Sequence, residues 1–515
     1  MKIVFLSMEM LIPEFPELNR GANFVGGLGI LAGDIMSGLA RTQIDGLGIV
    51  PFYRRNWKNG QEINYDFLGQ PIFEIEVEIG SNCRRHKIKV WRVKRGGQDL
   101  YGLECPEIFD YLYTGDRWKR FEQELLVGKA VPEILKRLKI KPDIVWLNES
   151  HTLPVIPEIK EDSYFQGVKI LFTIHTPVPD GLERYPKEWF KELRIDGRKY
   201  HFFIKNDCLD FAWAAMALAD LANGVSAEHG QVTKEMFPDF AQKIIGIKNG
   251  SDRELWLSHN LQAIENNLTP ENLWLAHQAD KKEFIEFIAN KTGVRLNFNK
   301  PIFVAVRRFV PYKNQCPMLK DIIRAICLDR NKQIETPLGW LSGLGLQVVL
   351  GGIISDSRCY HWAEEFGDWM RDPELRGKFL HINDYSFDLL LKGARGSDVW
   401  FSAPWLKWEA CGTSDQRAAM NGIINLTSKT GGAMEYIKEF SSQADGGNGF
   451  YIEPYEPRTI YEKLKIISSL YYAHQENNDK QWLKLMQNVF EVGKKLDITL
   501  MIEEYKEKLF VPLTK

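Results

Sequence analysis

The sequence predicts an α/β protein made of two doubly wound domains, each with a mostly parallel sheet covered by helices on both faces. Short apolar runs alternate with longer amphipathic stretches, as strands and helices do in such folds. This pattern stops at the polar, Asn-rich stretch 252–273 and then starts again. The 515 residues are enough for two large lobes. Because ligands of such folds bind at the carboxyl ends of the strands, we expect functional side chains just after the strands.

The first domain is predicted to span residues 1–260. Its buried strands are expected at 3–5, 46–52, 144–147 and 168–173, with a further short strand at 224–226. Its helices are expected at 33–41, 122–138 and 205–222. Within 122–138, apolar residues recur every three or four positions, as one face of a helix requires.

The second domain is predicted to span residues 266–490. Its strands are expected at 301–306, 347–350, 378–381, 399–403 and 423–426, each followed by a helical stretch. The stretch 252–273 is the expected crossing point between the domains. No short repeat or low-complexity tract interrupts either half.

The composition is that of an ordinary globular protein, with 44% hydrophobic and 26% charged residues, which excludes a disordered, collagenous or coiled-coil chain. The net charge of −2 favours neither nucleic acid nor a membrane as a partner. The seven cysteines are dispersed without a Cys-x-x-Cys pair, which favours reduced thiols in the cytoplasm and predicts no metal site. The longest apolar stretch, 211–222, is too short to span a membrane, and the first residues lack a signal sequence.

A glycine-rich loop precedes the first predicted helix. Gly26, Gly27 and Gly29 let the backbone approach a ligand closely, and a helix N-terminus favours an anion. The spacing is not that of a dinucleotide-binding fingerprint, and no acidic residue ends the strand 46–52. Taken alone, this loop is more simply explained as a tight turn.

Two cations follow the strand 301–306. Arg308 and Lys313 are placed to meet at its carboxyl end, where a planar guanidinium and a compact ammonium can together hold a phosphate or diphosphate. The alternative is a solvated charge cluster. The position directly after a buried strand favours phosphate binding.

Two further motifs follow strands of the second half. Glu409, after the strand 399–403, can accept sugar hydroxyls while the backbone that follows donates to others; alternatively, it is only an acidic residue that favours a helix start. Thr430, Gly431 and Gly432 precede a predicted helix at 433–438 and form a second candidate anion cradle.

The histidines are ambiguous on their own. His151 lacks metal-ligand spacing, and His175 follows the strand 168–173. For each of them a hydrogen-bonded structural role is the simpler reading, because the sequence identifies no partner. No Ser-His-Asp or Gly-x-Ser-x-Gly arrangement appears.

Taken together and in order, these motifs resemble the α-glucan (glycogen) phosphorylases, especially the bacterial type, and more distantly the glycogen and starch synthases. The resemblance covers nearly the whole chain, and many ordered blocks are more specific than any one of them. The matching blocks lie at 5–9, 26–34, 112–117, 123–124, 147–151, 175–179, 223–229, 249–250, 308–313 and 409–414.

The resemblance implies a GT-B fold, in which two Rossmann-like domains face each other with the active site in the cleft. It also implies that residues 491–515 form a helix that packs back onto the first domain. Implied roles are a backbone carbonyl of His175 at the sugar's anomeric centre and a contact from Asn249 to the 6-hydroxyl. The 3- and 4-hydroxyls would be held by Glu409, Ala410, Cys411, Gly412 and Thr413, and the phosphate by Arg308 and Lys313.

One departure from the phosphorylase pattern changes the expected chemistry. The lysine that carries pyridoxal phosphate in that family is replaced by Arg417, whose guanidinium stays protonated and forms no imine. We therefore expect no cofactor. A nucleotide-sugar would bring its own second phosphate, and the segments 429–433 and 449–455 look more like the synthases. Against this, the synthase lysine near the donor is absent, because residues 24–28 read Phe-Val-Gly-Gly-Leu.

The sequence thus predicts a cofactor-free, retaining glycosyltransferase in the cytoplasm. It would move a hexosyl group, with glucosyl favoured, from a nucleotide-sugar to a carbohydrate or small-molecule acceptor. Two alternatives stay open: a phosphate-dependent phosphorylase in which Arg417 is an extra phosphate clamp, and an inactive glucan- or nucleotide-binding protein.

Overall fold

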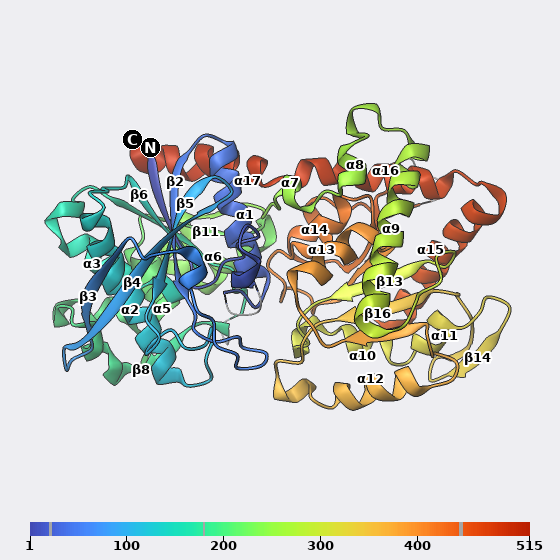
Figure 1. Cartoon of the computed structure of the whole chain (residues 1–515), viewed down its shortest axis with the longest axis horizontal. Coiled ribbons are helices and arrows are strands. Elements are labelled where there is room, and N and C mark those ends of the chain that lie inside the picture. The colour runs from blue at the N-terminus through green and yellow to red at the C-terminus, as the bar shows by residue number, and fades with distance from the viewer. Residues whose placement is uncertain (20–22, 179–180, 442–445) are drawn as a thin grey trace. The chain divides into compact units, whose positions relative to one another are not determined.

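A computed structural model describes residues 1–19, 23–178, 181–441 and 446–515 (Figure 1). The chain divides into two compact α/β units. Unit 1 comprises Met1–Asp252 together with Ile498–Lys515, and unit 2 comprises Arg253–Asp497. Residues 253–260, assigned above to the first domain, therefore belong to the second unit.

Unit 1 is built on a nine-stranded sheet in the order β12-β11-β7-β6-β1-β2-β5-β4-β3. Strand β1 is central and pairs in parallel with β2 and β6, so Phe5 lies between Gly48 and Trp146. The strands of this sheet are β1 (Lys2–Leu6), β2 (Asp45–Phe52), β3 (Phe73–Ile79), β4 (Arg84–Arg95), β5 (Gln98–Glu104), β6 (Ile144–Asn148), β7 (Lys169–Thr173), β11 (Leu221–Gly224) and β12 (Ile244–Gly246). The predicted parallel strands are present, each within a few residues of its expected position.

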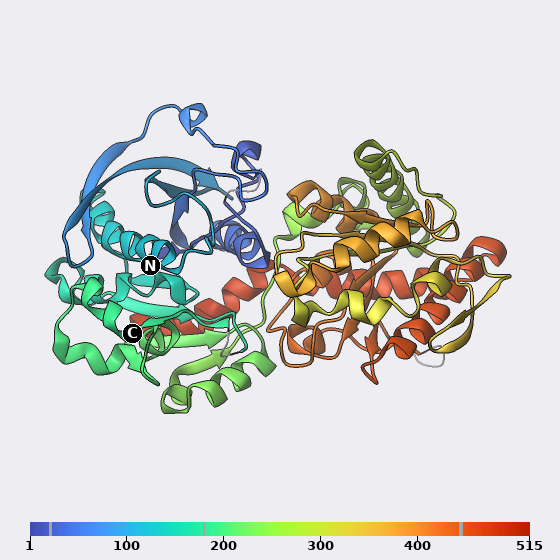
Figure 2. The same cartoon turned by 90° about the horizontal axis from the view of Figure 1, so that it is seen from below.

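An antiparallel extension of this sheet was not predicted. Strand β4 runs antiparallel to both β5 and β3 and curves out from the edge of unit 1, in blue in Figure 2. In β3, Ile75, Val77 and Ile79 are buried while Glu74 and Glu76 are exposed. This alternation marks a sheet with one solvated face, and it was missed because the prediction rested on continuous apolar runs.

The long helix predicted at 205–222 is wrong. The segment forms β9 (Ile204–Lys205), β10 (Cys208–Asp210), the short helix α5 (Phe211–Leu218) and then β11. Asn206 and Asp207 have positive φ values of 50° and 60°, which makes a tight turn between β9 and β10. Asp210 then caps α5 by accepting from the Trp213 amide. With β8 (Arg184–Pro186), β9 and β10 form a separate three-stranded sheet.

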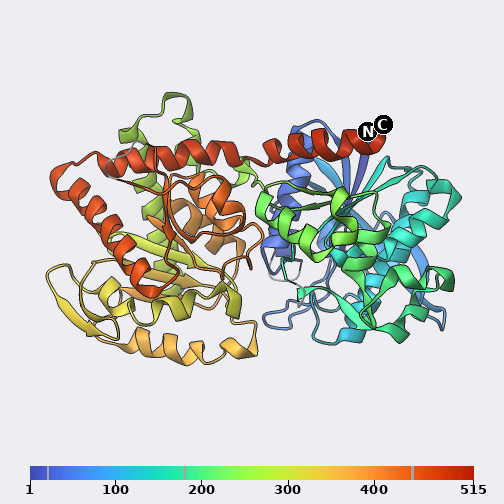
Figure 3. The ribbon, with the colours of Figure 1, turned by 180° about the vertical axis from the view of Figure 1, so that it is seen from behind.

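The helices of unit 1 are α1 (Gly27–Arg41), α2 (Arg117–Arg137), α3 (Val155–Glu161), α4 (Tyr200–Phe203), α5, α6 (Ala227–Met236), α17 (Ile498–Tyr505) and α18 (Val511–Thr514). Helix α1 begins six residues before the predicted start, so the glycine motif is its first turn rather than a loop. Figure 3 shows the C-terminal helices, in red, lying along unit 1 beside the N-terminus. Tyr505 packs on Trp146, and its hydroxyl accepts from Asn223 at 2.6 Å.

Unit 2 is built on a six-stranded parallel sheet in the order β17-β16-β13-β18-β19-β20. The five predicted strands are present, and β20 was not predicted. Its strands are β13 (Ile302–Val306), β16 (Gln347–Gly351), β17 (Phe379–Ile382), β18 (Val399–Ser402), β19 (Ile424–Ser428) and β20 (Gly449–Ile452), with a separate hairpin of β14 (Gln333–Thr336) and β15 (Gly339–Ser342).

The helices of unit 2 are α7 (Arg253–Trp256), α8 (His259–Gln262), α9 (Pro270–Thr292), α10 (Gln315–Leu319), α11 (Ile323–Cys327), α12 (Trp362–Arg371), α13 (Phe387–Gly396), α14 (Ser414–Ala419), α15 (Pro457–Asn477) and α16 (Gln481–Gly493). The helix predicted at 433–438 is wrong, because only the short 3₁₀ turn Gly431–Glu435 forms there. Within the described parts of the chain, no helix has the length and apolar character needed to cross a bilayer.

Candidate active site

The predicted site residues fall into two groups, one in each unit. We call His175, Asn148 and Glu149 the unit 1 half-site, and Arg307, Lys313 and Glu409 the unit 2 half-site. Each group lies at the carboxyl ends of parallel strands, where folds of this kind bind ligands.

In the unit 1 half-site, the ring of His175 is held by the end of β6. Its Nε2 lies 2.7 Å from Asn148 Oδ1. The Asn148 amide nitrogen donates to Ser7 Oγ at 3.1 Å, so its oxygen is the acceptor and the proton is assigned to Nε2 of His175. Burial, with a smaller contribution from the nearby His229, lowers the pKa of His175 to about 3. The imidazole is therefore neutral at physiological pH.

The backbone of His175 is held by Glu149, which lies in the matching block 147–151 but had no predicted role. The Glu149 carboxylate accepts from the amide of His175 at 2.9 Å, from Thr176 Oγ1 at 3.1 Å and from the amide of Ser150 at 3.0 Å. Glu149 itself has a φ of 74°, a strained conformation for a residue with a side chain. The buried carboxylate of Glu149 thus fixes the loop that carries His175. Pro179, at the end of this motif, lies outside the described residues.

In the unit 2 half-site, Glu409 meets two cations. Lys313 Nζ pairs with Glu409 Oε2, and Arg307 Nη2 donates to the same oxygen at 2.8 Å. Arg307 also donates to Ser402 Oγ at the end of β18. Burial by itself raises the pKa of Glu409, but the charges and hydrogen bonds of Lys313 and Arg307 outweigh it and lower the pKa to about 2. Glu409 is therefore ionised at any ordinary pH.

The second cation on Glu409 is Arg307, which was not among the predicted site residues, and the role of Arg308 toward a phosphate stays a prediction. The backbone amide of Arg307 donates to Gly351 O at 2.9 Å and so continues the β13–β16 ladder. Arg307 therefore stays with the end of the sheet, and Arg308 is the half-buried residue that follows it. Strand parity does not separate the two arginines in the sequence, because every residue of β13 is buried on both faces.

Two glycines let the Glu409 loop and the turn after β19 pack backbone against backbone. Gly431 has a φ of 60°, and a Cβ there would lie 2.2 Å from the carbonyl oxygen of Glu409. A Cβ on Gly432 would lie 2.2 Å from Cys411 Sγ. The Gly432 amide donates to the Ala410 carbonyl at 3.2 Å. These glycines therefore allow the two loops to pack closely. The anion cradle was expected at the start of a full helix, but the structure has a five-residue 3₁₀ turn there.

The other residues predicted to bind the sugar donor lie in both units. Gly26 is the N-cap of α1, a helix of 15 residues, and a Cβ on Gly27 would meet nothing within 4 Å. Asn249 is buried, and its amide donates to Val225 O at 3.2 Å. Residues from Ala410 to Thr413 form the turn that leads into α14, and Thr430 Oγ1 accepts from the Lys407 amide at 2.7 Å. Their roles toward a donor stay predictions.

Arg417 is held by several contacts within unit 2. Its side chain is buried, its guanidinium lies 4.3 Å from the centre of the Trp256 ring, and Nη2 donates to Thr413 Oγ1 at 2.6 Å. Its carbonyl accepts from Asn421 Nδ2 at 2.9 Å. The position where the phosphorylase pattern has a lysine thus holds a stacked guanidinium. These residues do not fit a Schiff base with pyridoxal phosphate.

A cluster of buried ionisable groups lies in unit 1. Glu124, His151 and Glu183 bring possible ligand atoms within 4.8 Å of one another, a geometry that by itself could hold a metal ion. However, Arg120 Nη2 lies 2.8 Å from His151 Nε2 and pairs with Glu183. Because a guanidinium occupies the space between these groups, the cluster is an ion-pair network.

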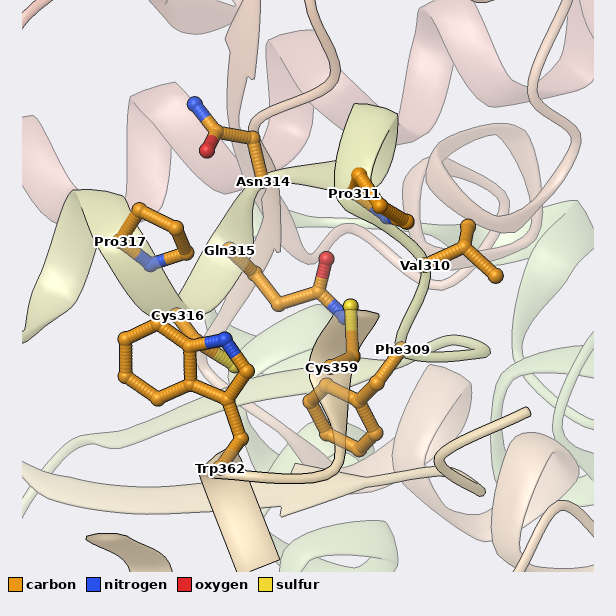
Figure 4. Close-up of a pocket in the computed structure, with 9 residues that line it drawn as sticks. All are labelled: Phe309, Val310, Pro311, Asn314, Gln315, Cys316, Pro317, Cys359 and Trp362. Atoms are coloured by element: carbon orange, nitrogen blue, oxygen red, sulfur yellow. The ribbon is translucent and has the colours of Figure 1, made fainter. Parts of the chain in front are cut away.

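A small cavity lies beside the Lys313 loop and has a volume of about 30 Å³ (Figure 4). Figure 4 shows the Gln315 amide pointing into it, toward Cys359 and Phe309. Gln315 is only 2% exposed, and neither of its amide atoms has a hydrogen-bond partner among the described residues. An unpaired buried amide costs about 1–3 kcal/mol, so Gln315 is a candidate ligand contact that the sequence analysis did not identify. The cavity lining consists of Phe309, Val310, Pro311, Asn314, Gln315, Cys316, Pro317, Cys359 and Trp362.

The chain is similar in sequence to known phosphorylases and synthases. Residues 2–241 match the family model of the starch synthase catalytic domain. The chain is 25% identical to a maltodextrin phosphorylase from Thermococcus litoralis, over 99% of this chain and 70% of that protein. It is 22% identical to a glycogen synthase from Finegoldia magna, over 93% of this chain and 97% of that protein.

Among solved structures, the catalytic domain of starch synthase IV from Arabidopsis thaliana, bound to ADP and acarbose, has the same fold. The TM-score is 0.78 at 18% sequence identity, covering 100% of this chain and 99% of that one. This likeness confirms the predicted GT-B fold. The sequence matches confirm the expected resemblance to both the phosphorylases and the synthases.

Proposed function

We propose that this chain, which has the GT-B fold and is similar to the glycogen phosphorylases and to the glycogen and starch synthases, is a glycosyltransferase. It transfers a hexosyl group from a nucleotide-sugar with retention and without pyridoxal phosphate. Glucosyl is the favoured group. The acceptor is a carbohydrate or a small molecule. The ADP and acarbose bound to the structural neighbour support a nucleotide donor and a carbohydrate acceptor.

The observation that carries this proposal is the state of Arg417. The residue offers no amine for an imine, and its guanidinium is buried against Trp256 and bonded to Thr413. The second phosphate that assists departure must then come from the substrate, and a nucleoside diphosphate-sugar supplies one. The same burial argues against Arg417 as an added clamp for free phosphate.

In this proposal the unit 2 half-site stabilises the leaving group. The bond from the anomeric carbon to the diphosphate oxygen breaks, and the bond to the acceptor oxygen forms on the same face of the sugar. The proton of the acceptor hydroxyl passes to the departing diphosphate. Negative charge grows on the departing diphosphate, so Lys313 and Arg308 contribute most in the transition state. Glu409 stays ionised and accepts hydrogen bonds from sugar hydroxyls.

The unit 1 half-site stabilises the sugar in the same proposal. Positive charge develops at the anomeric carbon as the leaving group departs, and a fixed carbonyl dipole at His175 counters it. A neutral imidazole is required there, because a cation would oppose that charge. The low pKa of His175 and its bond to Asn148 meet this requirement.

The Gln315 cavity supports a nucleoside on the donor. Gln315 follows Lys313 by two residues. Its side-chain amide has no partner among the described residues and offers one hydrogen-bond donor and one acceptor side by side. The hydrogen-bonding edge of a nucleoside offers the complementary pair. At about 30 Å³ the cavity admits such an edge and not a whole ring, which would lie over its mouth.

Thermal unfolding of the protein, measured with each of a panel of nucleotide-sugars, tests directly which of them binds as the donor. A true donor at 100 times its dissociation constant adds about 2.7 kcal/mol to the free energy of unfolding. The best donor is then used in a transfer assay, with the anomeric configuration of the product read by NMR. Release of sugar 1-phosphate from a glucan and inorganic phosphate, or stoichiometric pyridoxal phosphate in the purified protein, would overturn the proposal.

A further inference from the structure

Unit 2 carries a groove on its helical surface that the proposed reaction does not use. The N-terminal part of α9, the C-terminal end of α15 and the start of α16 form it. Its volume is about 580 Å³, within the range of about 300–1,000 Å³ that small-molecule sites usually have. These helices are labelled in Figure 1.

The groove is remote from the unit 2 half-site. Helix α15 begins at Pro457, shortly after β20, and the Tyr455 hydroxyl between them bonds to Ala403 O beside the Glu409 loop. The first turn of α15 is therefore at the catalytic edge of the sheet. The helix has 21 residues, and at a rise of about 1.5 Å per residue its last turn lies ~30 Å away.

The floor of the groove is aromatic and apolar. Trp274 is half-buried, with its ring 5.0 Å from that of His474 in an edge-to-face arrangement. The Nδ1 of His474 lies 2.9 Å from the Asp479 carbonyl oxygen, which fixes the imidazole. Beside Trp274, Leu275 is 68% exposed, although it is a large apolar residue on a long helix. The floor thus combines a half-buried aromatic ring with an exposed apolar side chain.

The rim of the groove is polar but carries no uncompensated charge. Glu271 pairs with Lys480 at 3.1 Å, and Glu476 pairs with Arg330. The amides of Gln475, Asn477 and Asn478 also line the groove, and each offers both a donor and an acceptor. Paired charges disfavour a phosphate, a nucleic acid or a charged peptide. The groove favours a neutral ligand with an apolar face and many hydroxyl groups.

We propose that this groove is a second carbohydrate-binding site, which holds a neutral glycan chain away from the site of transfer. A pyranose ring has an apolar face for Trp274 and hydroxyls for the amide rim. The benefit for catalysis rests on the proposed function. A polymeric acceptor anchored here raises the effective concentration of its chain ends at the unit 2 half-site, whereas an acceptor shorter than the ~30 Å separation gains nothing.

Binding of maltoheptaose and of glycogen to the full chain, measured by calorimetry and affinity electrophoresis without any donor, tests the site directly. Trp274→Ala and Leu275→Glu should each weaken binding at least tenfold. Trp340→Ala is the matched control, because Trp340 is 69% exposed on the β14–β15 hairpin and does not line the groove. Leu275→Glu lies on the surface and keeps the test valid if Trp274→Ala fails to fold.

A kinetic measurement gives the second readout. The groove variants should raise KM for glycogen at least fivefold and leave KM for maltotriose and for the donor unchanged. Unaltered glycan binding in both groove variants, or an equal loss in Trp340→Ala, overturns the proposal. If no nucleotide-sugar supports transfer but glycan binding still depends on Trp274 and Leu275, the proposed function fails and the groove assignment stands.

Discussion

The two half-sites hold their key groups by different physical means. In unit 1, fixed acceptors hold His175 and its loop. Asn148 Oδ1 accepts from the ring, and the Glu149 carboxylate accepts from the His175 amide and the Thr176 hydroxyl. In unit 2, ion pairs hold the groups, with Lys313 and Arg307 on the single carboxylate of Glu409. Unit 1 is thus organised by hydrogen-bond geometry, and unit 2 by charge.

This difference indicates which half-site a donor must rearrange. The contacts of His175 are already complete, so the unit 1 half-site can receive a sugar without moving. In the free protein Lys313 forms an ion pair with Glu409, and a diphosphate that binds must compete with Glu409 for the Lys313 ammonium. Pairing in the free protein also lowers the cost of keeping a buried cation and a buried anion there.

The largest expected effect is the loss of the Lys313 charge. In our proposal Lys313→Ala lowers kcat by about 10²–10³-fold, the usual cost of removing one group that stabilises charge in the transition state. Lys332→Ala is the control, because Lys332 is an exposed lysine of the same unit and pairs with the exposed Glu374. Steady-state kinetics should show less than a twofold change for it, since surface pairs contribute little. Full activity of Lys313→Ala would remove Lys313 from the proposed stabilisation of the leaving group.

The next effect tests whether unit 1 acts through geometry alone. Glu149→Gln places an amide nitrogen among groups that all donate, so the His175 loop should shift and kcat should fall by about 10²-fold. Glu192→Gln is the control, because Glu192 is also buried in unit 1 and accepts from the amide and hydroxyl of Ser81. Nucleotide affinity should not change in either variant. Equal losses of kcat in the two variants would show that Glu149 matters only for folding.

Much of unit 2 was predictable, since its sheet consists of continuous apolar runs. The runs at 301–306 and 399–403 placed Lys313 and Glu409 at neighbouring strand ends, and the structure brings them into contact. Arg307 was missed because two adjacent arginines look alike in sequence. Only the ladder bond to Gly351 distinguishes the one that stays with the sheet.

Less of unit 1 was predictable, because its site depends on local backbone conformations. Nothing in the residue type of Glu149 indicates a φ of 74° or three accepted hydrogen bonds. The segment 205–222 has helical composition, but the turn at Asn206 and Asp207 breaks it into strands and a short helix. Runs of similar side chains predict regular elements, whereas single residues with positive φ decide where those elements end.

The two half-sites should also differ in how acid destabilises them. The folded-state pKa of His175 is about 3, below its ordinary value of 6.5, so between these values the unfolded chain binds the proton and the folded chain does not. Stability is then lost as pH falls from about 6.5 toward 3, by at most about 1.4 kcal/mol per pH unit for this group. The folded-state pKa of Glu409 is about 2, below its ordinary value of 4.5, so the stability that Glu409 contributes is lost as pH falls from about 4.5 toward 2. His175→Gln should flatten the upper part of the profile in urea unfolding; an unchanged slope between pH 6 and pH 4.5 would contradict this assignment.

The smallest expected effect compares two buried glutamines of unit 2, which are both 2% exposed. Gln347 accepts from the Asn297 amide at 2.6 Å and donates to the Asn297 carbonyl at 2.8 Å, whereas the amide of Gln315 is unpaired. Gln347→Leu should therefore destabilise the fold by about 1–3 kcal/mol, because it leaves the groups of Asn297 without partners. Gln315→Leu should instead stabilise the fold by about 1 kcal/mol, because it removes an amide that is buried without a partner.

If a nucleoside edge pairs with Gln315, the gain in stability will come with a loss of binding. Gln315→Leu should weaken nucleotide binding about three- to tenfold, the free energy of one neutral hydrogen bond, and leave kcat nearly unchanged. Urea unfolding and calorimetric titration with the nucleoside diphosphate separate the two effects. A variant that is more stable and binds the nucleotide as well as the parent would limit the cavity to a packing defect and leave Lys313 and Arg308 as the donor contacts of this loop.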